Sequence, residues 1–269
     1  MPAINQNDLK QLISAGFLTP QQIKGSKTPR LAVLSDGKTK SGKSHWALMT
    51  TPEPVAYIML DPGALEISEK AIKAGRQIIP KFIGHDKKEN QETAKKLWQE
   101  YRSTVRAVLG AKSIRTIVVD TMSESWELAR LSQFGKLDKV PGFMYTAINA
   151  EFSGLCDEIY YGRPDLNIIY LQRLKKAYKD NEWDGRTMES KGYGELEYNV
   201  DLSIRQYFIP RKGKEEPGFG FQVKESEATR KGAEFAGLQF EREECSFIDL
   251  ALTIFKDDPV GGDPAYWLE

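Results

Sequence analysis

The stretch from Leu31 to Leu48, LAVLSDGKTKSGKSHWAL, constrains the fold of this chain more than any other. It predicts a short apolar strand over 31–34, a loop bounded by two glycines, and a helix over 45–49. The loop has the spacing G-x-x-x-x-G-K-[ST], in which a tightly bent backbone turns successive N–H groups towards a phosphate. A turn rich in glycine and lysine can match this spacing by chance. Here, however, strand, loop and helix occur in the order that a phosphate-binding loop requires.

Each part of this loop has an expected role towards a nucleoside triphosphate. The helix that begins near Lys43 adds the positive end of its dipole, and the Lys43 ammonium reaches the β- and γ-phosphates. The Ser44 hydroxyl is placed to bind Mg²⁺. We therefore predict ATP and Mg²⁺ as cofactors; no NKxD motif that would read guanine is visible. The predicted nucleotide-binding residues are Gly37, Lys38, Thr39, Lys40, Ser41, Gly42, Lys43, Ser44 and His45.

Two further apolar runs each end in an aspartate. Residues 55–60 lead into Asp61, and residues 114–119 lead into Asp120. The carboxyl ends of parallel strands face the ligand in α/β sheets, so both carboxylates are expected near the phosphates. We predict that Asp120 holds the metal, either through water or through Ser44. Asp120 is also placed to cap the following helix, and one side chain can serve both needs.

Polar side chains at these strand ends are candidates for the hydrolytic step. Asp61, Glu66 and Glu124 are candidates for orienting the attacking water. The alternatives are that Asp61 opens a turn and that Glu66 caps the next helix. A fourth apolar strand, over 166–171, ends in Gln172, whose amide would face the same rim and sense the γ-phosphate. The alternative for Gln172 is ordinary polarity at the end of a strand.

A basic segment with interspersed aromatic residues follows Gln172. Cations that bind phosphates and rings that stack on bases suit a single strand, so we predict single-stranded DNA as a partner. Acidic residues dilute this segment, and the alternative is a solvated loop or a β-excursion. The predicted DNA-binding residues are Lys175, Lys176, Tyr178, Lys179 and Arg186.

The rest of the chain predicts additions to one α/β domain. We expect an N-terminal helical arm over 1–28, the domain over 29–256, and a flexible C-terminal tail over 257–269. The arm either packs on its own domain or docks on a neighbouring subunit. Strands over 198–208 and 220–223 predict a terminal hairpin. Four cations on or after this hairpin are candidates to reach a neighbour's nucleotide: Lys212, Lys214, Lys224 and Arg230.

The composition excludes several classes of function. Lysine plus arginine and aspartate plus glutamate number 38 each, which excludes a uniformly basic nucleic-acid binder but allows a local basic patch. Two distant cysteines argue against a disulfide framework or a zinc site, and two histidines give little support to a His-based metal centre. No apolar run is long enough to span a bilayer and no secretory signal is visible. We therefore expect a cytoplasmic protein without a membrane partner.

Four stretches together resemble a known family: DGKTKSGKS, RTIVVDTMSE, LNIIYLQRLKK and GELEYNVDLSIR. Over residues 29–230 the chain resembles the phage-encoded RecA-like P-loop ATPases of single-strand annealing and recombination. The resemblance implies an α/β fold with a mostly parallel central sheet, flanking helices and a terminal β-hairpin. It also implies ATP hydrolysis, homo-oligomerisation, and single-stranded DNA binding near the loops after Asp120 and Gln172. Cooperation with a single-strand-binding protein and a location in the host cytoplasm would follow for a phage-encoded chain.

Three hypotheses for the function remain open at this point. The first is a DNA-dependent ATPase of a recombination, annealing or repair system. The second is a P-loop kinase that phosphorylates a nucleotide or small metabolite, with Arg173 or Arg186 on a lid. The third is a nucleotide-gated interaction module in which Asp61 and Glu66 have no role. An activity assay distinguishes the three. ATP turnover stimulated by single-stranded DNA favours the first, phosphate transfer to a metabolite favours the second, and slow turnover insensitive to DNA favours the third.

Overall fold

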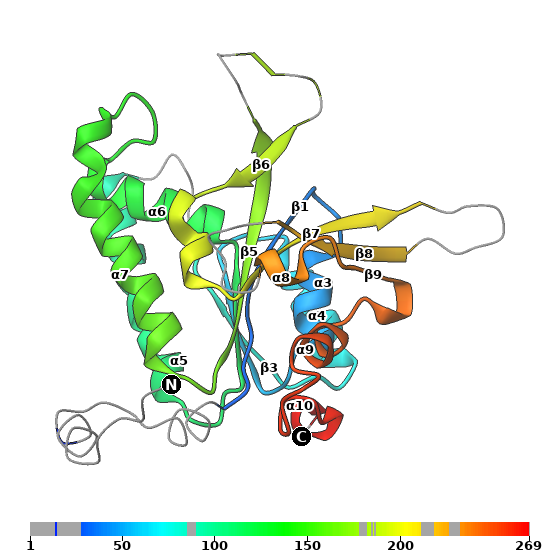
Figure 1. The fold of residues 1–269 in the computed structure, drawn as a ribbon. Helices are drawn as coiled ribbons and strands as arrows, with labels where there is room; N and C mark the ends of the chain where they lie inside the picture. The colour runs from blue at the N-terminus through cyan, green and yellow to red at the C-terminus, as the bar shows by residue number, and fades with distance from the viewer. Residues whose placement is uncertain are drawn as a thin grey trace.

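The computed structural model describes residues 14, 28–84, 90–177, 182–183, 185, 187–210, 218–225 and 232–268. Within these residues, nine strands form one sheet at the centre of the molecule (Figure 1). Apart from Ser14 and Thr28, the predicted arm over 1–28 lies outside the described residues.

Six neighbouring strands of this sheet are parallel, in the order β3-β2-β4-β5-β1-β7. The antiparallel strands β8 and β9 follow β7, and β6 pairs with the outer half of β5 in antiparallel fashion. The α/β class with a mostly parallel sheet is therefore confirmed. The strand bounds are β1 Ala32–Gly37, β2 Val55–Met59, β3 Ile78–Phe82, β4 Thr116–Asp120, β5 Asn167–Lys176, β6 Met188–Lys191, β7 Leu202–Ile209, β8 Gly218–Val223 and β9 Gln239–Glu241.

Helices cover both faces of the sheet and enclose two apolar cores. One face packs against α5 (Gln91–Gly110), α6 (Met122–Phe134) and α7 (Thr146–Gly162), and the other against α3 (Lys43–Thr50), α4 (Ala64–Lys73) and α9 (Phe247–Ile254). Strand β4 shows how the pleat divides these cores, because Val119 faces the α5–α7 side and Val118 faces the α3 side. Strands buried on both faces explain the continuous apolar runs of the sequence. The shorter elements are η1 Gly142–Tyr145, η2 Gly194–Asn199, α8 Gly232–Phe235, η3 Arg242–Glu244 and α10 Pro264–Leu268.

Two strands extend further than their apolar runs predicted. Strand β1 continues through the buried residues Ser35 and Asp36 to Gly37, so the phosphate loop starts directly at the strand end. Strand β5 continues to Lys176, and β6 returns beside it. The basic segment therefore starts as one strand of a β-hairpin, as in the β-excursion alternative.

The C-terminal tail differs from the flexible segment that its Pro/Gly-rich composition predicted. Helix α10 carries Trp267, whose side chain is buried and packs against Phe247 and Phe255. The Trp267 indole N–H donates to the Gly261 carbonyl at 2.8 Å, and the Tyr266 hydroxyl donates to the Pro29 carbonyl at 2.6 Å. The tail thus closes the end of the α3-side core. No helix of the described residues is long and apolar enough to cross a membrane.

We expect Trp267→Ala to destabilise the domain by about 3–5 kcal/mol, because it removes a fully buried indole and its hydrogen bond. Urea denaturation followed by circular dichroism measures this loss. Leu268→Ala is the matched control, since that side chain is 68% exposed and its loss is expected to change stability by less than about 0.5 kcal/mol. Equal stability of the two variants would show that the tail contributes nothing to the core.

Candidate nucleotide-binding site

The phosphate loop joins β1 to α3, and its two glycines are required by close packing. A Cβ on Gly37 would lie 2.4 Å from Ser41 Oγ and 2.7 Å from the Gln206 carbonyl oxygen. Gly42 has a φ of 91° and precedes the first residue of α3, and a Cβ there would lie 2.8 Å from the Phe219 ring. Only glycine meets both demands at Gly42, because other residues rarely adopt the left-handed region.

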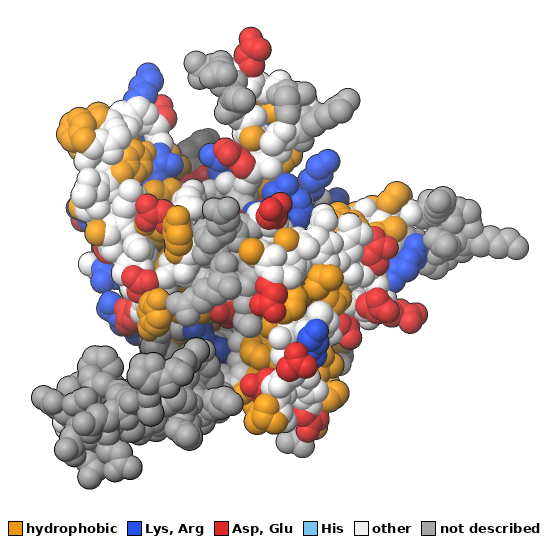
Figure 2. Space-filling model, in the orientation of Figure 1, with side chains coloured by type: hydrophobic (Ala, Val, Ile, Leu, Met, Phe, Trp, Pro, Cys, Tyr) orange, Lys and Arg blue, Asp and Glu red, His pale blue; other side chains and the backbone are white. Residues whose placement is uncertain are grey.

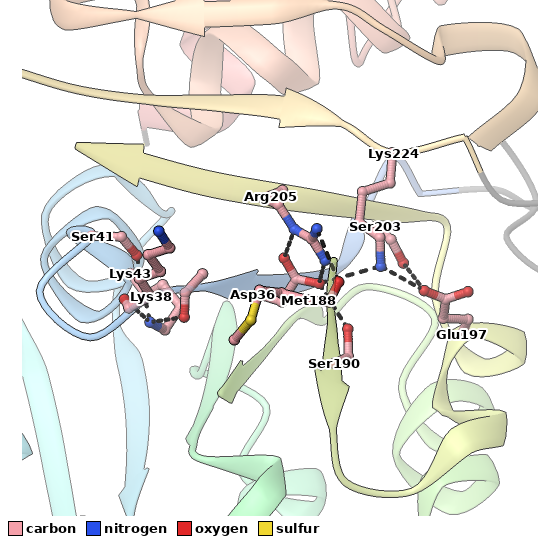
Figure 3. Close-up of polar contacts among 11 residues, drawn as sticks. Asp36, Lys38, Ser41, Lys43, Met188, Ser190, Glu197, Ser203, Arg205 and Lys224 are labelled. Carbon is pink, nitrogen blue, oxygen red and sulfur yellow. Dashed lines mark hydrogen bonds and ion pairs between the residues drawn. The ribbon is translucent and has the colours of Figure 1, made fainter. Parts of the chain in front are cut away.

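Lys43 lies inside this loop (Figure 3). Its ammonium donates to the carbonyl oxygens of Gly37 at 3.0 Å and Lys38 at 2.9 Å. Burial lowers the pKa of Lys43, while the carboxylates of Asp120 and Asp36 act in the opposite direction. The Lys43 ammonium therefore lies next to the start of α3. The backbone N–H groups of a helix start can bind an anion, so charge and N–H groups are available to the same phosphate.

Ser44 and Asp120 are brought together as predicted for a metal site. The Ser44 hydroxyl donates to Asp120 Oδ2 at 2.6 Å, joining the start of α3 to the end of β4. Burial raises the pKa of Asp120, and the hydrogen bonds from Ser44 and Tyr57 oppose that rise. These are hard oxygen ligands, and Mg²⁺ commonly binds one or two protein oxygens together with substrate phosphates. The donor set therefore fits Mg²⁺. Among the described residues no cluster of three or more His, Cys, Asp or Glu side chains offers a second metal site.

Helix α6 is capped by Thr121 rather than Asp120. The Thr121 side-chain oxygen accepts a hydrogen bond from the Glu124 N–H at 3.2 Å. Asp120 is therefore not needed as a cap, and its carboxylate faces the phosphate loop instead.

Tyr57 is a member of the site that the sequence did not reveal. It lies in the middle of β2, and its hydroxyl donates to the same Asp120 Oδ2 at 2.6 Å. Burial of the ring and the nearby Asp120 charge raise the pKa of Tyr57, so it remains a donor at neutral pH. A tyrosine within an otherwise aliphatic strand is the one available signal, because a buried phenol needs a polar partner.

The three candidate carboxylates have different surroundings. Asp61 accepts from the Gly63 N–H at 2.9 Å and from Arg173 at 2.6 Å, with its side chain 34% exposed. Although burial acts to raise the pKa of Asp61, the Gly63 amide and Arg173 hold it below its usual value. Glu124 is nearly buried and also pairs with Arg173. Asp61 is thus an ionised carboxylate that a water molecule can reach.

Glu66 is not brought into this site. Its side chain is 77% exposed on α4 and pairs with Lys70, one turn later on the same helix, at 2.6 Å. The prediction of a water-orienting role for Glu66 has no support in this arrangement. The alternative, in which Glu66 caps α4, is not seen either, because the N-cap is Gly63 and no side chain makes a cap hydrogen bond; Glu66 lies in the first turn, where a negative charge favours the helix dipole.

At the end of β5 the structure brings Arg173, rather than Gln172, to the site. Side chains alternate along a strand, so Gln172 shares the α5–α7 face with Tyr170 and Arg173 shares the α3 face with Leu171. Gln172 is buried and its amide nitrogen lies near Gly192. The predicted γ-phosphate contact of Gln172 has no support in this arrangement, whereas Arg173 touches two of the three candidate carboxylates, Asp61 and Glu124.

The predicted DNA-binding residues fall into two groups. Lys175 pairs with Glu189 at 3.0 Å, and the Lys176 ammonium lies 4.1 Å from the centre of the Trp183 ring. Tyr178, Lys179 and Arg186 lie outside the described residues.

Of the four cations predicted to reach a neighbour's nucleotide, Lys224 is the one among the described residues, and its partners lie within its own chain. Lys224 donates to Glu197 at 2.9 Å and to Asp36 at 3.3 Å, so it does not extend towards a neighbour. The candidates Lys212, Lys214 and Arg230 lie outside the described residues.

A second buried carboxylate stands directly before the loop. Asp36 accepts two hydrogen bonds from Arg205, at 2.8 and 2.9 Å, and one from Ser190 at 2.7 Å (Figure 3). Burial acts to raise the pKa of Asp36, but Arg205 and Lys224 outweigh it and lower the pKa. This cluster ties the start of the phosphate loop to β6, to β7 and to the end of β8.

Comparison with known proteins gives a likeness to solved structures only. No family model matches the chain, and no curated protein matches it. A KaiC-like protein, PH0186, from the hyperthermophilic archaeon Pyrococcus horikoshii OT3 is 14% identical, with 78% of this chain and 84% of that chain covered and a TM-score of 0.42. A prototypical ATPase from the type III secretion system of pathogenic bacteria is 11% identical, with 67% of this chain and 51% of that chain covered and a TM-score of 0.42. This chain therefore spans about half the length of the second structure.

Proposed function

We propose that this protein is a Mg²⁺-dependent ATPase of the RecA-like kind that binds single-stranded DNA and acts in recombination, annealing or repair. The observation that carries the hydrolase part is the 2.6 Å hydrogen bond between Ser44 and Asp120 beside the loop that encloses Lys43. A serine hydroxyl and an aspartate joined at this point form the magnesium side of a triphosphate site.

The direction of the nucleotide follows from the carboxylates. The γ-phosphate belongs near Asp120 and Asp61, so the nucleoside extends the other way across the start of α3 towards β8. There the rings of His45 and Phe219 lie with their centres 6.4 Å apart, beside a hollow of about 400 Å³. We place the adenine at these rings, which retains the predicted nucleotide contact of His45 and adds Phe219.

The residues of this site would promote hydrolysis mainly by position and charge. Lys43 would exchange its two carbonyl partners for phosphate oxygens and offset their charge. Ser44 and Asp120 would hold Mg²⁺, which would supply charge neutralisation on the phosphates. Asp61 would orient the attacking water, and Arg173 holds Asp61 in place from the end of β5, on the far side of β4.

The DNA part of the proposal is supported by the hairpin of β5 and β6. This hairpin leaves the sheet at the same edge as the phosphate loop (Figure 1) and carries Lys176 next to Trp183. A cation and a ring together suit the backbone and bases of a single strand. A homo-oligomer and a single-strand-binding protein as partner belong to the same proposal.

The two rival functions have less support. A kinase would need a mobile lid arginine; Arg173 is engaged by Asp61 and Glu124 at the end of a strand, and the other candidate, Arg186, lies outside the described residues. A non-catalytic module would need no ionised carboxylate that water can reach beside Lys43, and Asp61 is one, although it also opens the turn at Gly63 and pairs with Arg173.

An ATPase assay with and without single-stranded DNA, and with and without Mg²⁺, tests the proposal. We expect turnover that needs Mg²⁺ and rises when DNA is added. Turnover should also fall at acid pH, because burial raises the pKa of Asp120 and its protonation removes a metal ligand. Transfer of phosphate to an added nucleoside would instead support the kinase, and turnover unchanged by any DNA would contradict the DNA part.

A further inference from the structure

Asp120 is a charged side chain in the interior of the molecule. On the face shown in Figure 2, acidic and basic side chains are spread over the surface, whereas Asp120 is only 4% exposed. Burying a carboxylate is costly unless hydrogen bonds or a cation compensate for the water that it loses. The groups that contact Asp120 therefore show how each of its two oxygens is used.

Both hydrogen bonds to this carboxylate end on the same oxygen. The Ser44 hydroxyl and the Tyr57 hydroxyl each donate to Asp120 Oδ2 at 2.6 Å. No described residue donates a hydrogen bond to Asp120 Oδ1. A carboxylate oxygen has two lone pairs, so these two donors fill Oδ2. Oδ1 is then the oxygen that is left for Mg²⁺ or for one of its waters.

The two donors differ in what a bound nucleotide asks of them. Ser44 lies at the start of α3 and is a predicted ligand of Mg²⁺, so its oxygen has to serve the metal as well as Asp120. Tyr57 lies in the middle of β2 and is fully buried in the α3-side core. Close packing holds such a ring in one orientation. Tyr57 is therefore the donor that has no second duty towards the nucleotide.

The register of β2 and β4 places the Tyr57 hydroxyl at Asp120. Tyr57 pairs with Val118, and Met59 pairs with Asp120. Since side chains alternate along a strand, Asp120 shares the α3 face with Val118 and lies about 7 Å further along β4. A phenol spans this distance and ends in a donor, whereas serine and threonine are too short and phenylalanine has no hydroxyl.

We propose that Tyr57 is a positioning residue for Mg²⁺, whose hydroxyl fixes the rotation of the Asp120 carboxylate so that Oδ1 is presented to the metal. This role rests on the proposed function, because the metal concerned is the Mg²⁺ that would accompany ATP. Tyr57 acts through Asp120 and touches neither metal nor phosphate. Partners that stand behind a metal ligand in this way commonly change metal affinity by roughly 10- to 100-fold.

Removal of the hydroxyl tests the proposal through metal binding rather than turnover. Mn²⁺ takes the place of Mg²⁺, and electron paramagnetic resonance measures free Mn²⁺ while the protein with ADP is titrated. We expect Tyr57→Phe to weaken Mn²⁺ binding about 10-fold or more, because the ring stays in place and only the donor is lost. Binding of ADP without a divalent metal should be unchanged, since Asp120 acts only through the metal.

Tyr101→Phe is the matched control. Tyr101 is equally buried, but its hydroxyl donates to Met122 Sδ in the core on the opposite face of the sheet. This variant should bind Mn²⁺ as the unaltered protein does. Replacing Tyr57 by 4-aminophenylalanine restores an N–H donor at the end of the ring, so it should return most of the affinity that Tyr57→Phe loses.

The outcomes separate this role from the proposed function. Equal Mn²⁺ affinity of Tyr57→Phe and the unaltered protein would overturn the role of Tyr57 and leave the proposed ATPase standing. An equal loss in Tyr101→Phe, or no recovery with 4-aminophenylalanine, would also overturn it, because the loss would then come from packing. No binding of Mn²⁺ by the unaltered protein with ADP would remove both this role and the metal site of the proposed ATPase.

Discussion

Replacing Lys43 by alanine is expected to reduce ATP turnover by about 10²-fold or more, the usual cost of removing one group that stabilises the transition-state charge. The Lys43 ammonium donates to the Gly37 and Lys38 carbonyls at the centre of the loop. Among the described residues no second cation donates to these carbonyls, so none would replace Lys43 in the variant. Release of inorganic phosphate at saturating MgATP measures the effect.

The matched control for this variant is Lys73→Ala, which removes an equal side chain from the exposed face of α4. Its turnover should equal that of the unaltered protein. Unaltered turnover in Lys43→Ala would refute the assignment of the loop as the triphosphate site, whatever the DNA experiments show.

Asp61→Asn is expected to lower turnover by about 10²- to 10⁴-fold while ATP binding is retained, because general-base assistance is typically of this size. Asparagine keeps the shape of the side chain, so Gly63 and the strand end should stay in place. Single-turnover hydrolysis combined with a fluorescent-nucleotide binding assay separates the chemical step from binding.

Two further variants decide which carboxylate acts. Glu66→Gln should have no effect, because that side chain is exposed and pairs with Lys70. Glu124→Gln should have a smaller effect than Asp61→Asn, because Glu124 is buried behind its pairing with Arg173. A large loss of turnover in Glu124→Gln, together with near-normal turnover in Asp61→Asn, would show that Glu124 and not Asp61 orients the attacking water.

The elements around the phosphate loop were predictable because their signals are local. Glycine spacing between an apolar strand and a helix start defines the loop, and in the structure this loop joins β1 to α3, whose first two residues are Lys43 and Ser44. Asp61 and Asp120 were candidates because each directly follows an apolar run, and parallel strands bring such residues to one edge of the sheet.

The same apolar runs do not predict which side chains of a strand face which side of the sheet. A strand buried on both faces has no alternation of polar and apolar residues, so nothing in LNIIYLQR tells which of Gln172 and Arg173 faces the nucleotide. The same reason hid Tyr57 within VAYIML.

Partners that are distant in the chain account for the remaining differences. Asp36 looked like part of a loop, but residues between 154 and 188 positions away supply its hydrogen bonds and keep it in a buried strand. Trp267 lies in a segment whose prolines and glycines indicated flexibility, yet its burial depends on Phe247 and Phe255, which composition does not connect to it.

The most direct measurement is isothermal titration calorimetry with a non-hydrolysable ATP analogue. We predict uptake of about one nucleotide per chain in the presence of Mg²⁺, weaker binding without the metal, and no detectable heat for Lys43→Ala. No uptake by the unaltered protein with Mg²⁺ present, or equal uptake by Lys43→Ala, would contradict a triphosphate site at residues 37–44.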